Sequence, residues 1–178
     1  MKFNNTNKGF SLLESMIAIG ILLVAVVAPL STIGDSLAQI YVARDQMVAI
    51  NLAQEGIEAV RQVRDSNMIK GWREGSPRNT LWNAGGLDTQ GFYSVDLSET
   101  PTLTTGSAQG DSLKQDVTTG VYGNSGTETK FRRVVFIEPI SGSPDETKIT
   151  STILWKTAGG TDKKIEVSES LFGINTTP

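Results

Sequence analysis

Hydrophobic and charged positions divide this chain of 178 residues into three zones. A short polar stretch comes first, and residues 16–34 then carry no charge and are mostly apolar. Residues 35–69 mix apolar and charged positions, and the last third of the chain alternates between the two kinds. About 19 uncharged residues are enough for a helix that crosses a membrane, and they exceed what a soluble domain of this size normally buries as one helix. The pattern therefore predicts a membrane-length helix near the N-terminus, followed by a globular region.

Residues 35–69 are predicted to continue this helix in amphipathic form. They contain no proline, one glycine (Gly56) and mostly good helix formers. At 100° per residue their apolar positions form two stripes. One stripe holds Val48, Ala49, Leu52, Gly56, Ala59, Val60 and Val63, and the other holds Met47, Ile50, Ala53 and Ile57. Two stripes indicate that one packs on the chain's own sheet and the other meets neighbouring molecules. The alternative is a single wide stripe.

The last third of the chain predicts an antiparallel sheet. Strands are expected at residues 131–140, 148–157 and 163–172, because apolar and polar side chains alternate there. The turn-forming residues 141–145 and 158–161 separate them. The expected fold class is therefore α+β, with a long N-terminal helix packed on a C-terminal antiparallel meander of three or more strands.

Residues 70–130 are the least regular part of the chain. A strand is expected at residues 92–97, where apolar and polar positions alternate. Residues 98–128 are rich in Thr, Gly, Ser and Asp, which predicts a long loop with at most short strands, such as one at residues 117–122. We therefore interpret residues 70–130 as a variable, loop-rich insertion between the helix and the meander.

A single carboxylate, that of Glu14, lies at the head of the apolar segment, five residues after Gly9. An acidic side chain costs roughly 2.5–3.5 kcal/mol at the centre of a spanning helix and less near the membrane interface. Such a side chain usually faces a partner rather than lipid. A cut after Gly9 would create a positive α-amino group on Phe10, and this group, on the same chain or on a neighbour, is the natural partner of Glu14.

Three plainer interpretations of this segment compete. In the first, it is a secretory signal peptide with Lys2 and Lys8 as its basic region and a cut after Ala28, but Pro29 would follow that cut and is expected to block it. In the second, it is a plain single-span anchor oriented by the two lysines, which leaves the position of Glu14 unexplained. In the third, it is a buried core helix, for which the uncharged run is too long.

The segment Gly9–Glu14, with the sequence Gly-Phe-Ser-Leu-Leu-Glu, and the apolar run after it resemble the processing site of type IV prepilins and type II secretion pseudopilins. In that family the chain is cut after the glycine on the cytoplasmic side, the new N-terminus is methylated, and the glutamate is needed for assembly. The resemblance covers residues 8–34 and is specific, because each of these features must fall at a set position. It implies that Gly9 and Phe10 are the substrate of a prepilin peptidase, and that Glu14 neutralises the Phe10 amine of an adjacent subunit.

The resemblance also implies an organisation for the chain. Its parts would be a leader (1–9), a transmembrane and filament-core helix (10–34), an amphipathic helix continuing into the globular domain (35–69), the loop-rich insertion (70–130) and the β-meander (131–178). The precursor would span the bacterial inner membrane once and later enter an extracellular pilus or a periplasmic pseudopilus. Its implied partners are membrane lipid before assembly, other pilin or pseudopilin subunits and the inner-membrane assembly platform. The long, polar, cysteine-free insertion favours a minor subunit.

Pro29 is the candidate kink in the apolar helix. Family members often carry a proline near the middle of this segment, and Pro29 is slightly displaced from that position. Proline removes one backbone donor and clashes with the preceding turn, which predicts a kink or local melting over residues 25–29.

The amino-acid composition argues against catalysis by this chain. The chain has no cysteine and no histidine, which excludes Ser-His and Cys-His nucleophile pairs and His-based metal sites. The glycine-rich residues 120–126 lack the Gly-Lys-Ser/Thr ending of a phosphate loop and predict a turn. Two acidic pairs, Asp111 with Asp116 and Asp145 with Glu146, offer oxygen ligands to calcium but lack the ligand spacing of a known site. We therefore expect no enzyme activity, no cofactor and no bound metal.

Ligand binding is the second class of function that the chain allows, as a tip subunit with an adhesive or DNA-binding role. The candidate is a set of cations interleaved with two tryptophans that could stack on single-stranded nucleic acid: Arg61, Arg64, Lys70, Trp72, Arg73, Arg78 and Trp82. The stronger explanation is that Arg61 and Arg64 lie near a helix C-terminus, where positive charge is favoured, and that the tryptophans anchor a loop on the domain. The net charge of −3 is no footprint for bulk nucleic-acid binding, so nucleic acid is not the expected partner.

Overall fold

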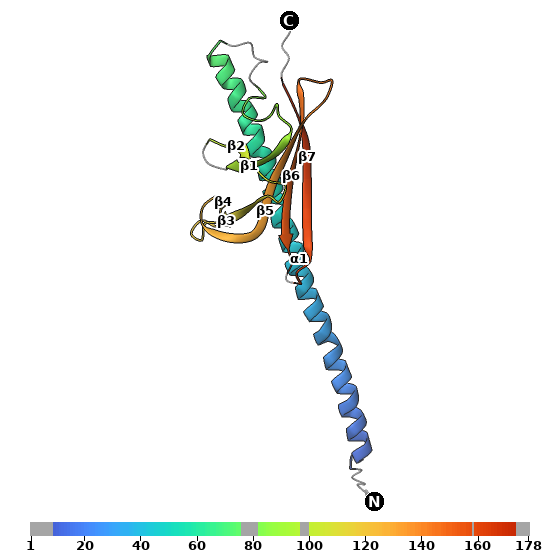
Figure 1. The fold of residues 1–178 in the computed structure, drawn as a ribbon. Coiled ribbons are helices and arrows are strands. Elements are labelled where there is room, and N and C mark those ends of the chain that lie inside the picture. The colour runs from blue at the N-terminus through green and yellow to red at the C-terminus, as the bar shows by residue number, and fades with distance from the viewer. Residues whose placement is uncertain (1–8, 76–81, 97–99, 158, 174–178) are drawn as a thin grey trace, which may run out of the picture. The chain divides into compact units, whose positions relative to one another are not determined.

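The residues that the computed structural model describes are 9–75, 82–96, 100–157 and 159–173, apart from the side chain of Ser31 (Figure 1). The chain forms two units, Met1–Arg44 and Asp45–Pro178. The described part of the first unit lies mostly in one long helix, α1. The second unit contains the rest of α1 and an antiparallel sheet, so the fold is α+β, as the sequence predicts.

Helix α1 (Leu12–Arg73) continues without a break through good helix formers. It ends just before Gly75, which has a positive φ of 69°, a conformation that glycine adopts at no steric cost. The backbone N–H of Gly75 donates to the Trp72 carbonyl oxygen at 3.4 Å. The helix therefore extends past residue 69, where the sequence analysis placed its end.

Seven strands follow α1 in the second unit, and each of their pairings is antiparallel. Their bounds are β1 (Gly91–Asp96), β2 (Thr102–Thr105), β3 (Asp111–Gln115), β4 (Tyr122–Gly123), β5 (Thr127–Pro139), β6 (Glu146–Lys156) and β7 (Asp162–Phe172). The last three strands form the predicted meander, in which β6 pairs with β5 and with β7.

Strand β5 is the centre of the sheet because it is long enough to hold two neighbours along one edge. Its C-terminal half pairs with β1, which places Tyr93 opposite Val135, and its N-terminal half pairs with β3, which places Asp111 opposite Arg133. Its other edge pairs with β6. The sheet order is therefore β2-β1-β5-β3-β4, with β6 and β7 on the far side of β5.

Residues 70–130 contain more regular structure than predicted. The strand expected at residues 92–97 is confirmed by β1 in its described part. The strand expected at residues 117–122 is wrong, because residues 117–121 form a turn in which Asp116 Oδ1 accepts hydrogen bonds from the backbone of the two residues after Val117. Strands β2 and β3 and the start of β5 lie where a loop was expected.

The core of the second unit lies between α1 and one face of the sheet, and Figure 1 shows the helix behind the strands. Alternation along β6 buries Ile149, Ile153 and Trp155 on this face. One cluster of buried side chains joins Val60 of α1 to Ile149, and a second joins Leu52 of α1 to Ile153 and Trp155. The sheet is thus held on the helix along much of the helix's second half.

Helix α1 buries one wide stripe rather than two. The first predicted stripe is buried or half-buried throughout, but Ala53 and Ile57 of the second stripe are buried as well, at 0% and 4% exposure. The reason is that Ala53 and Ile57 each lie four residues after another buried position, Ala49 and Ala53, and so share its face. Met47 and Ile50 stay exposed, so the prediction of a second stripe is wrong for half of its members.

Candidate functional site

The residues singled out by the resemblance lie where α1 begins. Gly9, Phe10 and Ser11 precede the helix, and the backbone N–H of Ser15 donates to the Ser11 carbonyl oxygen at 3.1 Å, which closes the first turn. Gly9 is exposed, and the Phe10 side chain is 78% exposed. The bond between Gly9 and Phe10 is therefore non-helical and accessible, as proteolytic cleavage requires.

Among the described residues, the structure gives no reason for a glycine at residue 9. A methyl group added at Gly9 would meet nothing within 4 Å, and the backbone there is outside the left-handed region. Neither close packing nor backbone strain therefore selects glycine at this position. A demand for glycine here would come from an enzyme that binds the junction between Gly9 and Phe10.

Glu14 lies in the first turn of α1. Negative charge is favoured at this end, because the first N–H groups of a helix have no intrahelical partner and carry partial positive charge. The next charged side chain along the chain is that of Asp35, beyond the apolar segment. The α-amino group that a cut after Gly9 would create on Phe10 stands four residues before Glu14 in the sequence.

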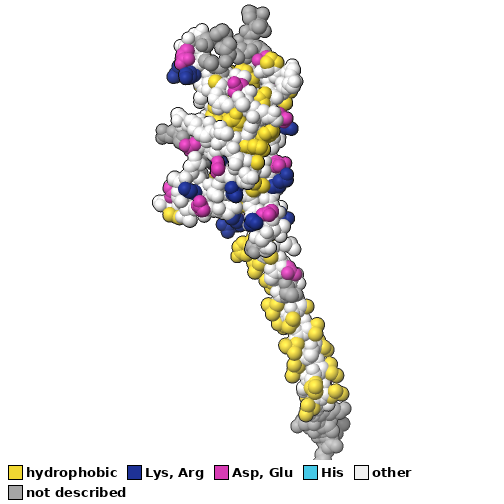
Figure 2. Space-filling view, in the orientation of Figure 1, with side chains coloured by type: hydrophobic (Ala, Val, Ile, Leu, Met, Phe, Trp, Pro, Cys, Tyr) yellow, Lys and Arg dark blue, Asp and Glu magenta, His cyan; other side chains and the backbone are white. Residues whose placement is uncertain are grey.

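The residues that follow Glu14 present apolar side chains to the surroundings of the helix. Leu12, Met16, Val24 and Leu30 are each more than 60% exposed, and no part of the most apolar window is buried inside the structure. The mean hydropathy of that window is 2.5, so α1 has the length and composition to cross a membrane. Figure 2 shows the hydrophobic side chains along this part of α1.

Hydroxyl groups near the ends of the apolar segment bond to the helix's own backbone. Ser15 Oγ donates to the Ser11 carbonyl oxygen at 3.4 Å, Thr32 Oγ1 to that of Ala28 at 3.3 Å, and Ser36 Oγ to that of Thr32 at 2.8 Å. A hydroxyl without a partner costs several kcal/mol in hydrocarbon. These bonds therefore make the three side chains compatible with a membrane.

Helix α1 stays helical through Pro29. The local melting expected over residues 25–29 is therefore not present, and a kink at Pro29 stays a prediction. Proline deprives the Ala25 carbonyl oxygen of its usual donor. The loss of one backbone bond leaves the turns on either side in place, because a helix of 62 residues propagates through many others.

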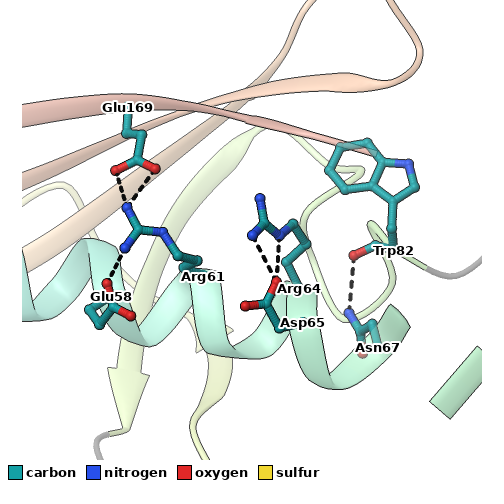
Figure 3. A network of polar contacts seen from close by, with 7 residues as sticks. All are labelled: Glu58, Arg61, Arg64, Asp65, Asn67, Trp82 and Glu169. Carbon is teal, nitrogen blue, oxygen red and sulfur yellow. Dashed lines mark hydrogen bonds and ion pairs between the residues drawn. The ribbon is translucent and has the colours of Figure 1, made fainter. Parts of the chain in front are cut away.

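Two arginines of the basic-aromatic set, Arg61 and Arg64, are engaged in ion pairs within the second unit (Figure 3). Arg61 Nη2 lies 2.7 Å from both carboxylate oxygens of Glu169, and Nη1 bonds to Glu58. The hydrogen bonds to Glu169 raise the pKa of Arg61 above its ordinary value. Arg64 Nε bonds to Asp65 at 2.8 Å. Arg61 therefore ties α1 to β7, and neither arginine presents an unpaired cation.

The two tryptophans of that set do not share a surface. Trp82 is 2% exposed and lies against Gly173, and its carbonyl oxygen accepts a hydrogen bond from Asn67 Nδ2 at 3.4 Å (Figure 3). Trp72 is 67% exposed in the last turns of α1, and Arg78 lies outside the described residues. The expected loop anchor is thus confirmed for Trp82 and wrong for Trp72. A buried indole cannot stack on a base, so the proposed stacking surface loses Trp82.

The acidic pairs belong to no larger cluster of possible metal ligands in the part of the chain that the structure describes. Asp116 Oδ1 accepts hydrogen bonds from the backbone N–H groups of Thr118 and Thr119, at 2.7 Å and 3.2 Å. These backbone bonds lower the pKa of Asp116 below its ordinary value. Among residues 9–75, 82–96, 100–157 and 159–173, no group of three or more Asp, Glu, His or Cys side chains is placed to hold a metal ion.

Arg133 is a buried, hydrogen-bonded charged residue that the sequence analysis missed. It is 3% exposed between α1 and the sheet, and its guanidinium donates to the Glu55 carboxylate at 3.3 Å and to the carbonyl oxygens of Leu52 and Val95 at 3.5 Å and 3.4 Å. Burial lowers the pKa of Arg133 and raises that of Glu55, and their mutual attraction opposes both shifts. Arg133 thus joins α1 to β1 and β5. Alternation along β5 places it on the inward face, which is the signal that could have found it.

Comparison with known proteins identifies the N-terminal segment. Residues 4–28 match the family model of the prokaryotic N-terminal methylation motif, and the match includes Gly9, Phe10 and Glu14. No curated protein and no solved structure matches the chain. The segment with the exposed junction, the first-turn carboxylate and the apolar helix is therefore the segment that the motif describes.

Proposed function

We propose that this chain is a type IV pilin-like precursor and a structural subunit of a type IV filament system, either a minor pilin or a type II secretion pseudopilin, because residues 4–28 match the prepilin-type methylation motif. One observation carries this proposal. The motif at residues 4–28 leads directly into a helix with the length and composition to cross a membrane. The motif implies processing by a prepilin peptidase and assembly with other pilins.

The peptidase cuts the bond between Gly9 and Phe10, and the new amine of Phe10 is methylated. The exposed, non-helical junction supports this step, since a peptidase needs an accessible and extended substrate. The absence of any local demand for glycine at residue 9 supports it too, because the glycine then serves the enzyme rather than the fold.

Glu14 pairs with the Phe10 amine of an adjacent subunit as the helices enter a bundle. A carboxylate and an ammonium attract each other more strongly in an apolar surrounding than in water, and an acidic side chain at membrane depth needs such a partner. Glu14 is the one charged side chain of residues 10–34, so it has no competitor for this role on its own segment.

The precursor spans the inner membrane once, in contact with lipid, and is then drawn by the assembly platform into an extracellular pilus or a periplasmic pseudopilus. The chain acts without catalysis, cofactor or metal. The long, polar insertion at residues 70–130, which contains no cysteine, favours a minor subunit. A tip subunit that binds a surface or DNA is the alternative, and the burial of Trp82 removes one of the features that favoured it.

The role of Glu14 is tested with Glu14→Ala in cells that carry a prepilin peptidase and an assembly system. We expect normal cleavage, because the cut lies before the changed residue, and a loss or strong reduction of the subunit in sheared filaments. Immunoblots of the membrane and filament fractions measure both steps. Asp35→Ala is the matched control, because it removes the next carboxylate along α1, beyond the apolar segment, and should assemble normally. Normal incorporation of Glu14→Ala would contradict the pairing.

A further inference from the structure

The second unit has a pocket of about 460 Å³ on its sheet that the proposed function leaves without a role. It lies between β3, β5 and β6 and the turn that joins β6 to β7. We call it the basic pocket, and its defining residues are Ser112, Lys130, Arg132, Leu154, Lys156 and Lys163. Figure 2 shows Lys and Arg side chains gathered at the end of the second unit where the turn between β6 and β7 lies.

The strand register brings the centre of the basic pocket together. Arg132 of β5 stands opposite Ser112 of β3 on one side and opposite Leu154 of β6 on the other. Directly opposed residues of antiparallel strands share a face. Phe131 and Ile153 alternate with them and point into the core beneath α1. The centre of the basic pocket therefore opens on the face of the sheet that α1 does not cover, whereas Lys163, which stands opposite Trp155, lines the pocket from the end of β7.

The charges of the basic pocket are unbalanced. Lys130 pairs with Asp45 at 2.5 Å, and Lys156 pairs with Asp162 at 3.3 Å. Within the described residues, Arg132 and Lys163 also line the pocket and take part in no such ion pair. Two of the four cations that line the pocket are thus left without a carboxylate partner.

Arg132 is held in place by a neutral group. Its Nε and Nη2 atoms donate to the Gly110 carbonyl oxygen at 3.2 Å and 2.7 Å. This contact orients the guanidinium without cancelling its charge, and Nη1 keeps its donors for a ligand. Leu154 is half-buried and gives the pocket an apolar side, and Ser112 and Gln109 add a hydroxyl and an amide.

We propose that the basic pocket binds a phosphate ester of a polyhydroxy compound. A phosphate monoester carries about −1.5 to −2 charges at neutral pH, which matches the two cations that have no carboxylate partner. Lysine and arginine are the side chains that bind phosphate best. The volume lies within the range of roughly 300–1,000 Å³ for organic ligands, so the ester's polyol part fits beside Leu154 within reach of the polar groups. A phosphorylated sugar and the glycerophosphate headgroup of a lipid share this chemistry.

The test is titration of the full chain in an uncharged detergent, followed by calorimetry and by backbone amide shifts. Glucose 6-phosphate and glycerol 1-phosphate are the probes for the two sources, with glucose and glucuronate as the neutral and singly charged controls. We expect at least one phosphate ester to bind at least tenfold more tightly than either control, with shifts at residues 109–112 and 154–163. The tighter of the two esters identifies the source. Equal binding of both controls, or no binding of either ester, would overturn the proposal.

The matched variants are Lys156→Gln with Lys163→Gln, and Lys148→Gln alone. Lys148 is exposed on the same strand as Lys156 but does not line the pocket, so its change controls for loss of charge in general. We expect the double variant to lose at least tenfold in affinity for the ester and Lys148→Gln to stay within twofold of the natural chain. An exposed ion pair contributes little to stability, so the double variant should fold, and Lys163→Gln alone repeats the test. Unchanged affinity in these variants, or an equal loss in Lys148→Gln, would refute the assignment.

Discussion

Among single residues, Gly56 determines how closely α1 can approach the sheet. A methyl group at this position would lie 2.5 Å from Ser151 Oγ and 3.1 Å from Arg133 Cδ. Ser151 Oγ is buried and has no hydrogen-bond partner among the described residues. Arg133 is held by Glu55 and by backbone carbonyl groups, so it cannot easily move away. The close contact between α1 and the sheet therefore requires a residue without a side chain at position 56.

We predict that Gly56→Ala destabilises the second unit. Alanine gains about 1 kcal/mol in helix propensity, but overpacking of a tight interface costs about 1–3 kcal/mol. A lower Tm by circular dichroism is the expected result. Adding Ser151→Ala should restore part of the loss, because it removes the nearest atom, and Gly34→Ala should have no such effect, because nothing lies within 4 Å of a methyl group there. A Gly56→Ala chain as stable as the natural one would show that the interface is looser than described.

Asp116 provides a pH-dependent test at the scale of one turn. Its carboxylate accepts backbone hydrogen bonds from Thr118 and Thr119, which lower its pKa below the ordinary value of 3.8. A group whose pKa is lowered by folding stabilises the folded turn above its ordinary pKa, and this stabilisation is lost as the pH falls through the lowered value. We expect the two threonine amide signals to titrate with a midpoint below 3.8, and to stop titrating in Asp116→Asn. A midpoint at or above 3.8 would contradict the turn geometry.

At the scale of an element, substitutions in α1 test whether the helix has one wide apolar stripe or two separate ones. Ala53 and Met47 belong to the same predicted stripe, yet Ala53 is 0% and Met47 66% exposed. We predict that Ala53→Gln lowers the free energy of unfolding by about 2 kcal/mol or more, because it forces a larger polar group into the interface. Met47→Gln should change it by less than about 0.5 kcal/mol. Urea denaturation measures both, and equal losses would restore the two-stripe interpretation.

The elements that sequence reasoning predicted well are those with a local signal. The meander of β5, β6 and β7 shows in the alternation of its strands, and α1 shows in its helical periodicity. Strand β3 was missed because Leu113 is its one buried apolar residue, and its place is set by pairing with β5, which is distant in sequence. The strand expected at Val117 was wrong because the side chain of Asp116 stabilises a turn there. The end of α1 was placed too early, before the glycine at residue 75 that ends it.

The residues of the candidate site also differ in whether the sequence alone reveals them. Gly9, Phe10 and Glu14 could be recognised from the sequence, because their meaning lies in their order along the chain. Alternation along β5 could have placed Arg133 on the inward face, but its partners and the basic pocket could not be recognised, because the neighbours come from other strands and from α1. A side chain whose role depends on its spacing along the chain can be recognised from the sequence. A side chain whose partners are set by strand register can be recognised only from the structure.

At the scale of the whole molecule, the two units have different surfaces. The first unit exposes apolar side chains along the helix, and such a surface calls for lipid or other helices around it. The second unit has its own core between α1 and the sheet and a charged exterior. A membrane-held precursor that later exchanges lipid for other subunits needs both kinds of surface in one chain.

The intact mass of the membrane-extracted chain, expressed with and without a prepilin peptidase, tests the central claim most directly. We predict loss of residues 1–9 and addition of one methyl group to Phe10, and only when the peptidase is present. A chain that stays uncut in both strains would be a plain membrane anchor. A cut after Ala28 would mark a signal peptide and would leave Glu14 without a role. Either of these masses would contradict the account.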